Sequence, residues 1–184
     1  MAQLGRSCCV CSGTPLSPRA KRLAFIDVEA SGLNEGSFPI EIGWAVLGGT
    51  AGGLLIQPDA TWSYDAWDDL AEEQHGIAWT ALQNTGMPAG EVVECLNQVL
   101  PAGTLALTDA FEWDSYWVER LFDVATQART CQLGDFWRSL AIATDPGRVA
   151  AGRRLDATIP RAHRARQDAE HLRDLWIQCV HPNK

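Results

Sequence analysis

The sequence predicts an α/β or α+β protein built on one mixed sheet, and three observations support this. Three strand-like runs come first along the chain, followed by helical segments, another strand and further helices. The length of 184 residues suits a single domain with a short appendage. Hydrophobic residues make up 46% of the chain, which is enough for a sizeable core and argues against a disordered protein. We therefore expect a hairpin sheet that is extended by a parallel strand and flanked by helices.

Strand-like runs are expected at Arg22 to Val28, at Phe38 to Leu47 and, more weakly, at Gly53 to Gln57. A short strand is expected within Gly103 to Ala110. In the first run, Ala24, Ile26 and Val28 share one wholly apolar face, so that face should be buried.

Helical patterns alternate with these strands in the rest of the chain. Residues 65–74 carry acids early, which suits the N-terminal half of a helix, and 87–100 shows apolar residues at helical spacing. Residues 111–125 and 134–143 are also expected to be helical. The last helix should begin at about Pro160 or His163 and end at Val180.

Residues 1–20 are rich in Ser, Cys, Gly and Pro, and this composition predicts a flexible lead-in before a domain that spans residues 21–182. No apolar run approaches the ~18 residues that a membrane helix needs, so no membrane contact is expected. The N-terminus also lacks an apolar stretch of signal-peptide length, which favours a cytoplasmic protein.

Six cysteines are spread unevenly, and their pattern is not that of a disulfide framework. Cys8, Cys9 and Cys11 cluster in the lead-in. If the two termini met, Cys8 and Cys11 could hold a structural zinc together with Cys179 and His181. The alternative is that these cysteines simply belong to a mobile lead-in.

The net charge of −8 argues against a protein that tracks along a duplex, but the charge is not evenly distributed. Residues 144–160 are expected to form a loop with Gly, Arg and Pro. Around and after this loop, six arginines face one acid, Asp156; they are Arg148, Arg153, Arg154, Arg161, Arg164 and Arg166. This segment could bind a few phosphates locally, or it could be a solvated basic loop.

Two carboxylates follow the apolar part of the first strand. Asp27 and Glu29 share a face with Phe25 and lie ~6.5–7 Å apart along a strand, so the like charges repel. A divalent cation would remove this repulsion, because hard cations such as Mg²⁺ prefer carboxylate oxygens. The alternative is a pair of acids that face water at the edge of the strand.

A second acidic group surrounds the start of the helix expected at 111–125, and its candidates are Asp109, Glu112 and Asp114. We expect a stripe of this helix to face the core and to leave Asp114 beside it; the stripe consists of Trp113, Trp117 and Leu121. Acids at this place could also do no more than complement the helix dipole.

The third group is "HRARQDAEHLRDLW", in which His163 and Asp168 are five residues apart. On one continuous helix they would be separated by ~140° and would not share a face. They can converge if His163 lies on the loop just before the helix, and Pro160 favours that position.

Taken together, "FIDVEASGL", "WDSYWVERL" after "LALTDA", and "HRARQDA" resemble the three motifs of the DEDDh superfamily of 3′–5′ exonucleases. "PIEIGWAVL" is similar to the second strand of that family, and "EEQHGIAWTAL" to a family segment that precedes a helix and holds His75 in a structural role. The resemblance covers residues 22–180. It implies a ribonuclease-H-like fold, in which a mixed central sheet has three antiparallel strands first, then parallel strands, and is flanked by helices.

The resemblance also implies a two-metal phosphodiester hydrolase. Asp27, Glu29, Asp114 and Asp168 would hold two ions, Mg²⁺ or Mn²⁺, which clamp the attacking and leaving oxygens. His163 would be the general base rather than a metal ligand. These five residues are the expected catalytic set, and the products would be nucleoside 5′-monophosphates from DNA or RNA 3′ ends.

Residues that contact the 3′ end follow from the same resemblance. Ser31, Gly32 and Leu33 would meet the terminal nucleotide, with Leu33 wedged against the base, and Arg164 would meet phosphate. Small ribonucleases of the family are often dimers, so a homodimer is an expectation by analogy.

Two further readings and one departure accompany this hypothesis. A catalytically silent module with the same fold, which binds nucleic acid or a protein, is the alternative; such modules usually lack one of the five residues, and all five are present here. The H-x-A-x-x-D-A form also disfavours other ribonuclease-H-type nucleases.

The departure is Asp109, where many family members have Asn. No residue indicates a choice between DNA and RNA.

Overall fold

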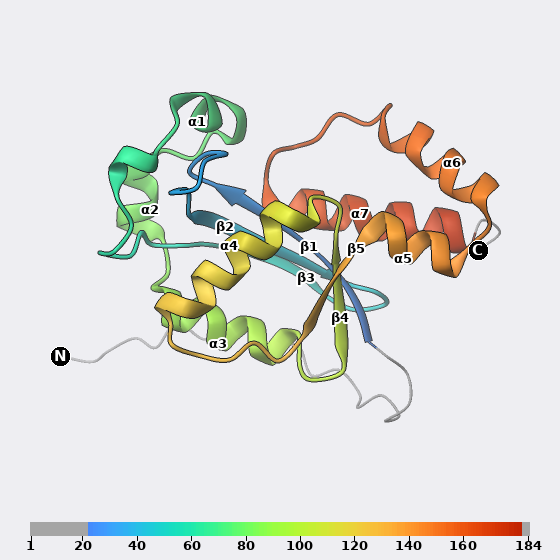
Figure 1. The fold of residues 1–184 in the computed structure, drawn as a ribbon, viewed down its shortest axis with the longest axis horizontal. Helices are drawn as coiled ribbons and strands as arrows, with labels where there is room; N and C mark the ends of the chain where they lie inside the picture. The colour runs from blue at the N-terminus through green and yellow to red at the C-terminus, as the bar shows by residue number, and fades with distance from the viewer. Residues whose placement is uncertain (1–21, 182–184) are drawn as a thin grey trace.

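The computed structural model describes residues 22–181 and contains a five-stranded mixed sheet with helices on both faces (Figure 1). The strand order is β3-β2-β1-β4-β5; β1, β2 and β3 pair antiparallel, and β4 and β5 extend the sheet in parallel with β1. The predicted α/β class and mixed sheet are therefore confirmed. The strands are β1 (Arg22–Ala30), β2 (Pro39–Val46), β3 (Ala51–Leu55), β4 (Thr104–Thr108) and β5 (Gln132–Asp135).

Seven α-helices and one short 3₁₀ helix connect and cover these strands in the described range. No helix among them combines the length and the hydropathy needed to span a bilayer. The helices are η1 (Tyr64–Ala66), α1 (Asp69–His75), α2 (Trp79–Thr85), α3 (Ala89–Val99), α4 (Phe111–Val124), α5 (Phe136–Ala143), α6 (Pro146–Asp156) and α7 (Ala165–Val180).

Strand β1 has a core on each of its faces. Ala24, Ile26 and Val28 pack into the core that α3 and α4 cover, as the alternation predicted. Phe25 enters a second core beneath α5 and α7, where its ring lies 5.8 Å from that of Trp176. Because side chains alternate along a strand, the residues two and four positions after Phe25 continue this second face toward the C-terminal end of β1.

Helix α6 corrects the loop that was expected at residues 144–160. The side chain of Asp145 accepts a hydrogen bond from the backbone N–H of Arg148 at 3.1 Å and caps the helix, and Pro146 occupies its first turn. Proline is well tolerated there, since the first-turn N–H has no partner inside the helix. The Gly, Arg and Pro content that suggested a loop is thus compatible with a capped helix.

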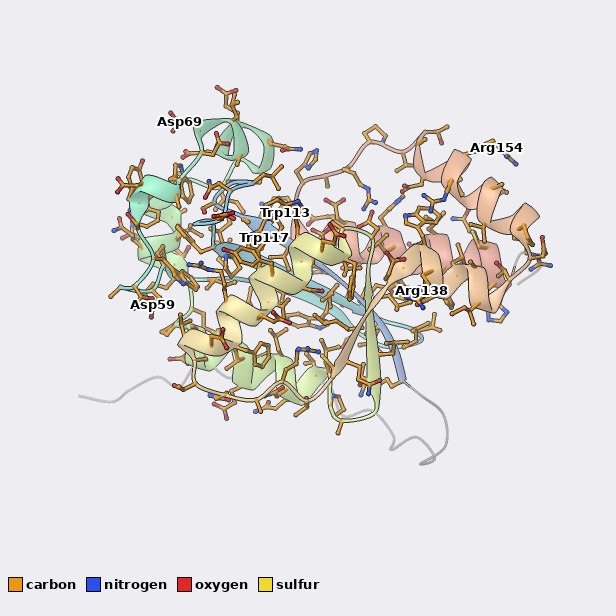
Figure 2. All side chains as sticks on the ribbon, in the orientation of Figure 1. Asp59, Asp69, Trp113, Trp117, Arg138 and Arg154 are labelled. Carbon is orange, nitrogen blue, oxygen red and sulfur yellow. The ribbon has the colours of Figure 1, made fainter. Side chains whose placement is uncertain are left out.

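Smaller differences concern three other segments. The helix expected at 65–74 is divided into η1 and α1 by a break at Trp67 and Asp68. A short strand, β5, comes before α5, where a helix alone was expected. Trp113 was expected in the core, but it is 38% exposed and stacks on the buried Trp117 at 5.4 Å between ring centroids (Figure 2).

Two expectations concern residues outside the described range. The lead-in, residues 1–20, and its Cys8 and Cys11 lie outside it, so the zinc hypothesis stays untested. Of its other two proposed ligands, Cys179 is buried against the second core, whereas His181 is exposed.

The N-terminal turn of α7 lies directly against β2 at Gly43. A Cβ atom at this position would overlap the backbone carbonyl of Ala165 and the backbone nitrogen of Arg166. Gly43 is also the register partner of Asp27 on β1. The missing side chain therefore lets the start of α7 approach the sheet beside Asp27.

We expect Gly43→Ala to lower the free energy of unfolding by roughly 1–3 kcal/mol, because an added methyl group must push α7 away from the sheet. Urea denaturation of the purified protein would measure this change. The matched control is Gly90→Ala, in α3, where a Cβ meets no atom within 4 Å. That change should be neutral or stabilising by up to about 1 kcal/mol. Equal stability of the two variants would contradict the packing argument.

Candidate metal and nucleic-acid site

Four of the predicted carboxylates gather near the C-terminal end of β1, and we call Asp27, Glu29, Asp114 and Asp168 the acidic cluster. The first two lie on β1, Asp114 lies in the first turn of α4, and Asp168 lies in the first turn of α7. The pKa of Asp27 is raised well above its usual range, first by burial and then by the charges of Asp114, Glu29 and Asp168. The sheet therefore brings together acids from three elements that are distant in sequence.

The pKa of Glu29 is raised to about 7, first by burial and then by the charges of Asp168 and Glu41, while Arg164 lowers it. Glu41 is the register partner of Glu29 on β2 and is 5% exposed. Burial of several acids in one place favours their protonated forms, so the cluster resists full ionisation at neutral pH when no cation compensates it.

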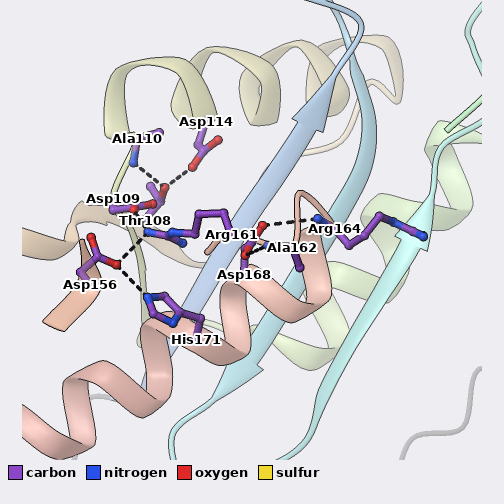
Figure 3. Close-up of polar contacts among 10 residues, drawn as sticks. All are labelled: Thr108, Asp109, Ala110, Asp114, Asp156, Arg161, Ala162, Arg164, Asp168 and His171. Atoms are coloured by element: carbon purple, nitrogen blue, oxygen red, sulfur yellow. Dashed lines mark hydrogen bonds and ion pairs between the residues drawn. The ribbon is translucent and has the colours of Figure 1, made fainter. Parts of the chain in front are cut away.

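Asp114 is held by the residue that ends β4. The hydroxyl of Thr108 donates a short hydrogen bond to Oδ2 of Asp114 and accepts one from the backbone N–H of Ala110 at 3.3 Å (Figure 3). The pKa of Asp114 is raised to about 8, chiefly by burial; the Thr108 hydrogen bond lowers it and the charge of Asp109 raises it. Thr108 fixes the orientation of a carboxylate that burial would otherwise leave without a partner.

Asp168 joins α7 to the segment that carries His163. Its Oδ1 accepts from the backbone N–H of Ala162 at 3.1 Å, and its Oδ2 accepts from the backbone N–H of Arg164 at 3.3 Å (Figure 3). His163 lies between these two donors and outside the helix, which is the position that allows it to converge with Asp168. Helix α7 begins at Ala165, later than the start that was expected at Pro160 or His163. We call residues 157–164, which connect α6 to α7, the His163 strap.

His163 faces two members of the acidic cluster. One ligand atom from each of Glu29, His163 and Asp168 can be chosen such that all three lie within 4.8 Å of one another. On its other side, Nε2 of Gln74 in α1 lies 3.2 Å from each ring nitrogen. The five residues expected to be catalytic therefore lie around one site, although three of them come from the first strand and the last helix.

Glu41 and its contact with Arg164 are the main site features that were not predicted from the sequence. The guanidinium of Arg164 donates to Glu41 through Nε at 3.0 Å and Nη2 at 2.8 Å, and the backbone N–H of Ala165 donates to Oε2 at 3.0 Å. This fork ties the start of α7 to β2. A single acid inside the buried strand "PIEIGWAV" was the signal that could have indicated it.

The residues expected to contact substrate follow β1. Ser31 is buried; its hydroxyl donates to the carbonyl of Ala66 at 3.1 Å and accepts from the backbone N–H of Phe38 at 3.1 Å. Gly32 packs closely on Asp68, whose Cβ would lie 3.0 Å from an added Cβ. Leu33 is 69% exposed and projects from this anchored loop.

His75, expected to be structural, is buried in α1. Its Nδ1 accepts a hydrogen bond from the backbone N–H of Ile77 at 3.0 Å, and burial lowers its pKa. A neutral, buried ring that orders its own loop agrees with that expectation.

No protein-family model matches the sequence, and no curated protein matches it. Solved structures do match. A zinc-bound complex of E. coli exonuclease I with single-stranded DNA has a TM-score of 0.65 at 14% identity, with 89% of this chain and 41% of that chain covered. Another exonuclease I structure has a TM-score of 0.66 at 14% identity, with 89% of this chain and 42% of that chain covered.

A moderately thermophilic exonuclease I from Methylocaldum szegediense gives a TM-score of 0.63 at 14% identity, again over 89% of this chain and 42% of that one. This chain therefore spans about two fifths of the length of the exonucleases that it matches. The matches show that this chain has the fold of exonuclease I, with a mixed sheet flanked by helices as the resemblance implied.

Proposed function

We propose that this chain is a metal-dependent 3′–5′ exonuclease that releases nucleoside 5′-monophosphates from the 3′ ends of single-stranded DNA or RNA. The observation that carries the proposal is the convergence of the acidic cluster and His163 at one end of the sheet. The exonuclease fold supports it, because the site lies on the elements that carry the three motifs.

The acidic cluster fits two divalent cations, Mg²⁺ or Mn²⁺. Burial and mutual repulsion raise the pKa of Asp27, Glu29 and Asp114, so the ionised cluster needs positive charge that the neighbouring arginines supply only in part. Two ions of charge +2 balance four carboxylates, and hard cations prefer such oxygen ligands. Asp27, Glu29, Asp114 and Asp168 would hold them. When bound, the ions would stabilise the charge on the attacking and leaving oxygens of an in-line displacement.

His163 would take the proton from the attacking water at one of its ring nitrogens. It is half-buried, lies beside Glu29 and Asp168, and is held between two backbone amides that donate to Asp168. A general base must lie within hydrogen-bond reach of the proton that it removes, and a fixed backbone on both sides of the residue provides that precision.

The terminal nucleotide would lie against the loop after β1. Leu33 offers an exposed apolar side chain, and hydrogen bonds of Ser31 anchor the loop behind it. Arg164 places a guanidinium, fixed by Glu41 but 41% exposed, where a phosphate could meet it. Binding of single strands is supported by the matched E. coli exonuclease I structures, which include complexes with dA16 and dT13 oligonucleotides.

A nuclease assay tests the proposal directly. With Mg²⁺ or Mn²⁺, the protein should shorten a 5′-labelled single-stranded oligonucleotide from its 3′ end, one nucleotide at a time, and release unlabelled mononucleotides. Asp168→Asn should abolish release, and His163→Ala should lower turnover by roughly 10²-fold or more, the usual contribution of a general base. Short RNA, long RNA and single-stranded DNA are compared side by side.

The matched control for this assay is Glu94→Gln, an exposed acid of α3 that lies outside the site and should keep full activity. Folded wild-type protein that binds an oligonucleotide but releases no mononucleotide with either metal would refute the exonuclease and favour the catalytically silent module.

The electrostatics of the cluster predict how stability depends on pH. Carboxyl groups with raised pKa bind more protons in the folded than in the unfolded state. Their contribution to the free energy of unfolding is therefore complete below pH ~4 and is lost as the pH rises to about 8. The melting temperature of EDTA-treated protein should therefore fall between pH 5.5 and 8.5. Mn²⁺ should raise it more at pH 8.5 than at pH 5.5, because the ions then compete with fewer protons.

Asp114→Asn isolates this effect from other titrating groups, because it removes the carboxyl group whose pKa is raised to about 8. Its melting temperature without metal should fall less steeply with pH than that of the wild type. Differential scanning fluorimetry measures the melting temperature of both proteins as a function of pH. If the two curves have the same slope, burial does not disfavour the ionised form of Asp114, and the prediction is wrong.

A further inference from the structure

The His163 strap holds its histidine in an unusual backbone conformation. His163 has a φ of 50°, in the left-handed region of backbone conformation that residues other than glycine seldom adopt. Such a conformation persists only when the surrounding contacts impose it. Arg164 supplies one of these contacts by binding Glu41 at the end of the strap. A second set of contacts lies on the other side of His163, at Arg161.

Arg161 forms ion pairs with two carboxylates outside the strap. Its Nη2 binds Oδ2 of Asp109, in the loop after β4, and lies 3.4 Å from Oδ1 of Asp156, the last residue of α6. The same oxygen of Asp156 is 2.7 Å from Nε2 of His171 in α7 (Figure 3). The four side chains are 13–23% exposed, so solvent screens these contacts less than it screens fully exposed ion pairs.

Two adjacent residues, the last of β4 and the one that follows it, contact both parts of the site. Thr108 holds Asp114 of the acidic cluster, and its neighbour Asp109 holds Arg161 of the strap. One short piece of backbone, Thr108 and Asp109, therefore fixes the distance between His163 and the acidic cluster. Burial lowers the pKa of Arg161, but the charges of Asp109 and Asp156, and after them those of Asp168 and Asp27, raise it overall.

We propose that Asp109 and Arg161 are positioning residues, which hold the His163 strap against the acidic cluster so that the histidine keeps its place for proton transfer. The proposal rests on the proposed exonuclease function. It assigns to Asp109 the role of an anchor for the strap and not that of a fifth metal ligand.

The geometry separates these two roles for Asp109. Its Oδ2 is already bound to a guanidinium, so the negative charge that Asp109 adds to the site is matched by Arg161. Asn, which many members of the resembling family have at this position, could not form an ion pair with Arg161. In this chain, Asp109 is thus paired with a cation on the strap.

The experiment compares Asp109→Asn, Arg161→Gln and the double variant with the wild type. Each single change should lower kcat by roughly tenfold at nearly constant KM, because a small displacement of a catalytic group costs rate rather than binding. The double variant should be no slower than the worse single one, since both changes break the same pair. Arg161→Lys, which keeps the charge but not the guanidinium group, should recover part of kcat and gives a milder variant if the others fold poorly.

Two further readouts do not depend on turnover. Amide hydrogen exchange at residues 157–164 should be faster in both single variants, and Mn²⁺ affinity measured by calorimetry should stay close to that of the wild type. Arg173→Gln, which breaks the exposed pair with Asp174 on α7, is the matched control and should change none of these quantities.

The outcomes are distinct. If Asp109→Asn weakens Mn²⁺ binding as strongly as Asp168→Asn does, Asp109 is a metal ligand and the anchor role is wrong. If the variants keep wild-type kcat and exchange rates, the anchor is equally refuted. If the wild type has no nuclease activity, the proposed function fails, while faster exchange of the strap in the variants would still support the anchor.

Discussion

The first turn of α7 rests on a position of β2 that has no side chain, and the geometry of the acidic cluster depends on this contact. Gly43 allows the backbone of Ala165 to approach the sheet so closely that Asp168 reaches the two acids of β1. The fork between Arg164 and Glu41 then fixes the same turn from the side. Close packing and a partly exposed ion pair act together here, since the first sets the distance and the second sets the orientation.

This arrangement places ionisable acids at the C-terminal end of β1, where burial disfavours their charged forms. A protein core of this size could easily cover the end of β1 with apolar residues, yet three acids with raised pKa stand there instead. Conflicts of this kind between local chemistry and packing are typical of functional sites. The surrounding cations are not spread evenly: Arg161 and Arg164 flank His163, and each is engaged by a carboxylate on another element. The strap therefore owes its position to contacts with the rest of the fold.

The parts that were predictable from the sequence are those with local patterns. The alternation of β1 placed Asp27 and Glu29 on one face, and the five-residue spacing indicated that His163 would converge with Asp168 more easily from the loop before the helix, where it lies. Pattern and spacing could not reveal pairs such as Arg164 and Glu41, which are 123 positions apart in the chain. Helix α6 was missed because its signal is a capping side chain in a segment with little hydrophobic periodicity. Trp113 was misplaced because helical spacing alone does not show where the neighbouring elements end.

The acidic cluster takes its members from the first strand, from α4 and from the last helix of the described fold, and this has a consequence for the order of folding. Asp27 and Glu29 emerge early in synthesis, whereas Asp168 follows only when most of the chain has been made. Closing so long a loop costs entropy that only the docked helix recovers. A nascent or partly folded chain therefore carries the two acids of β1 without their partners, and the complete set of five residues forms only when α7 has docked on the sheet.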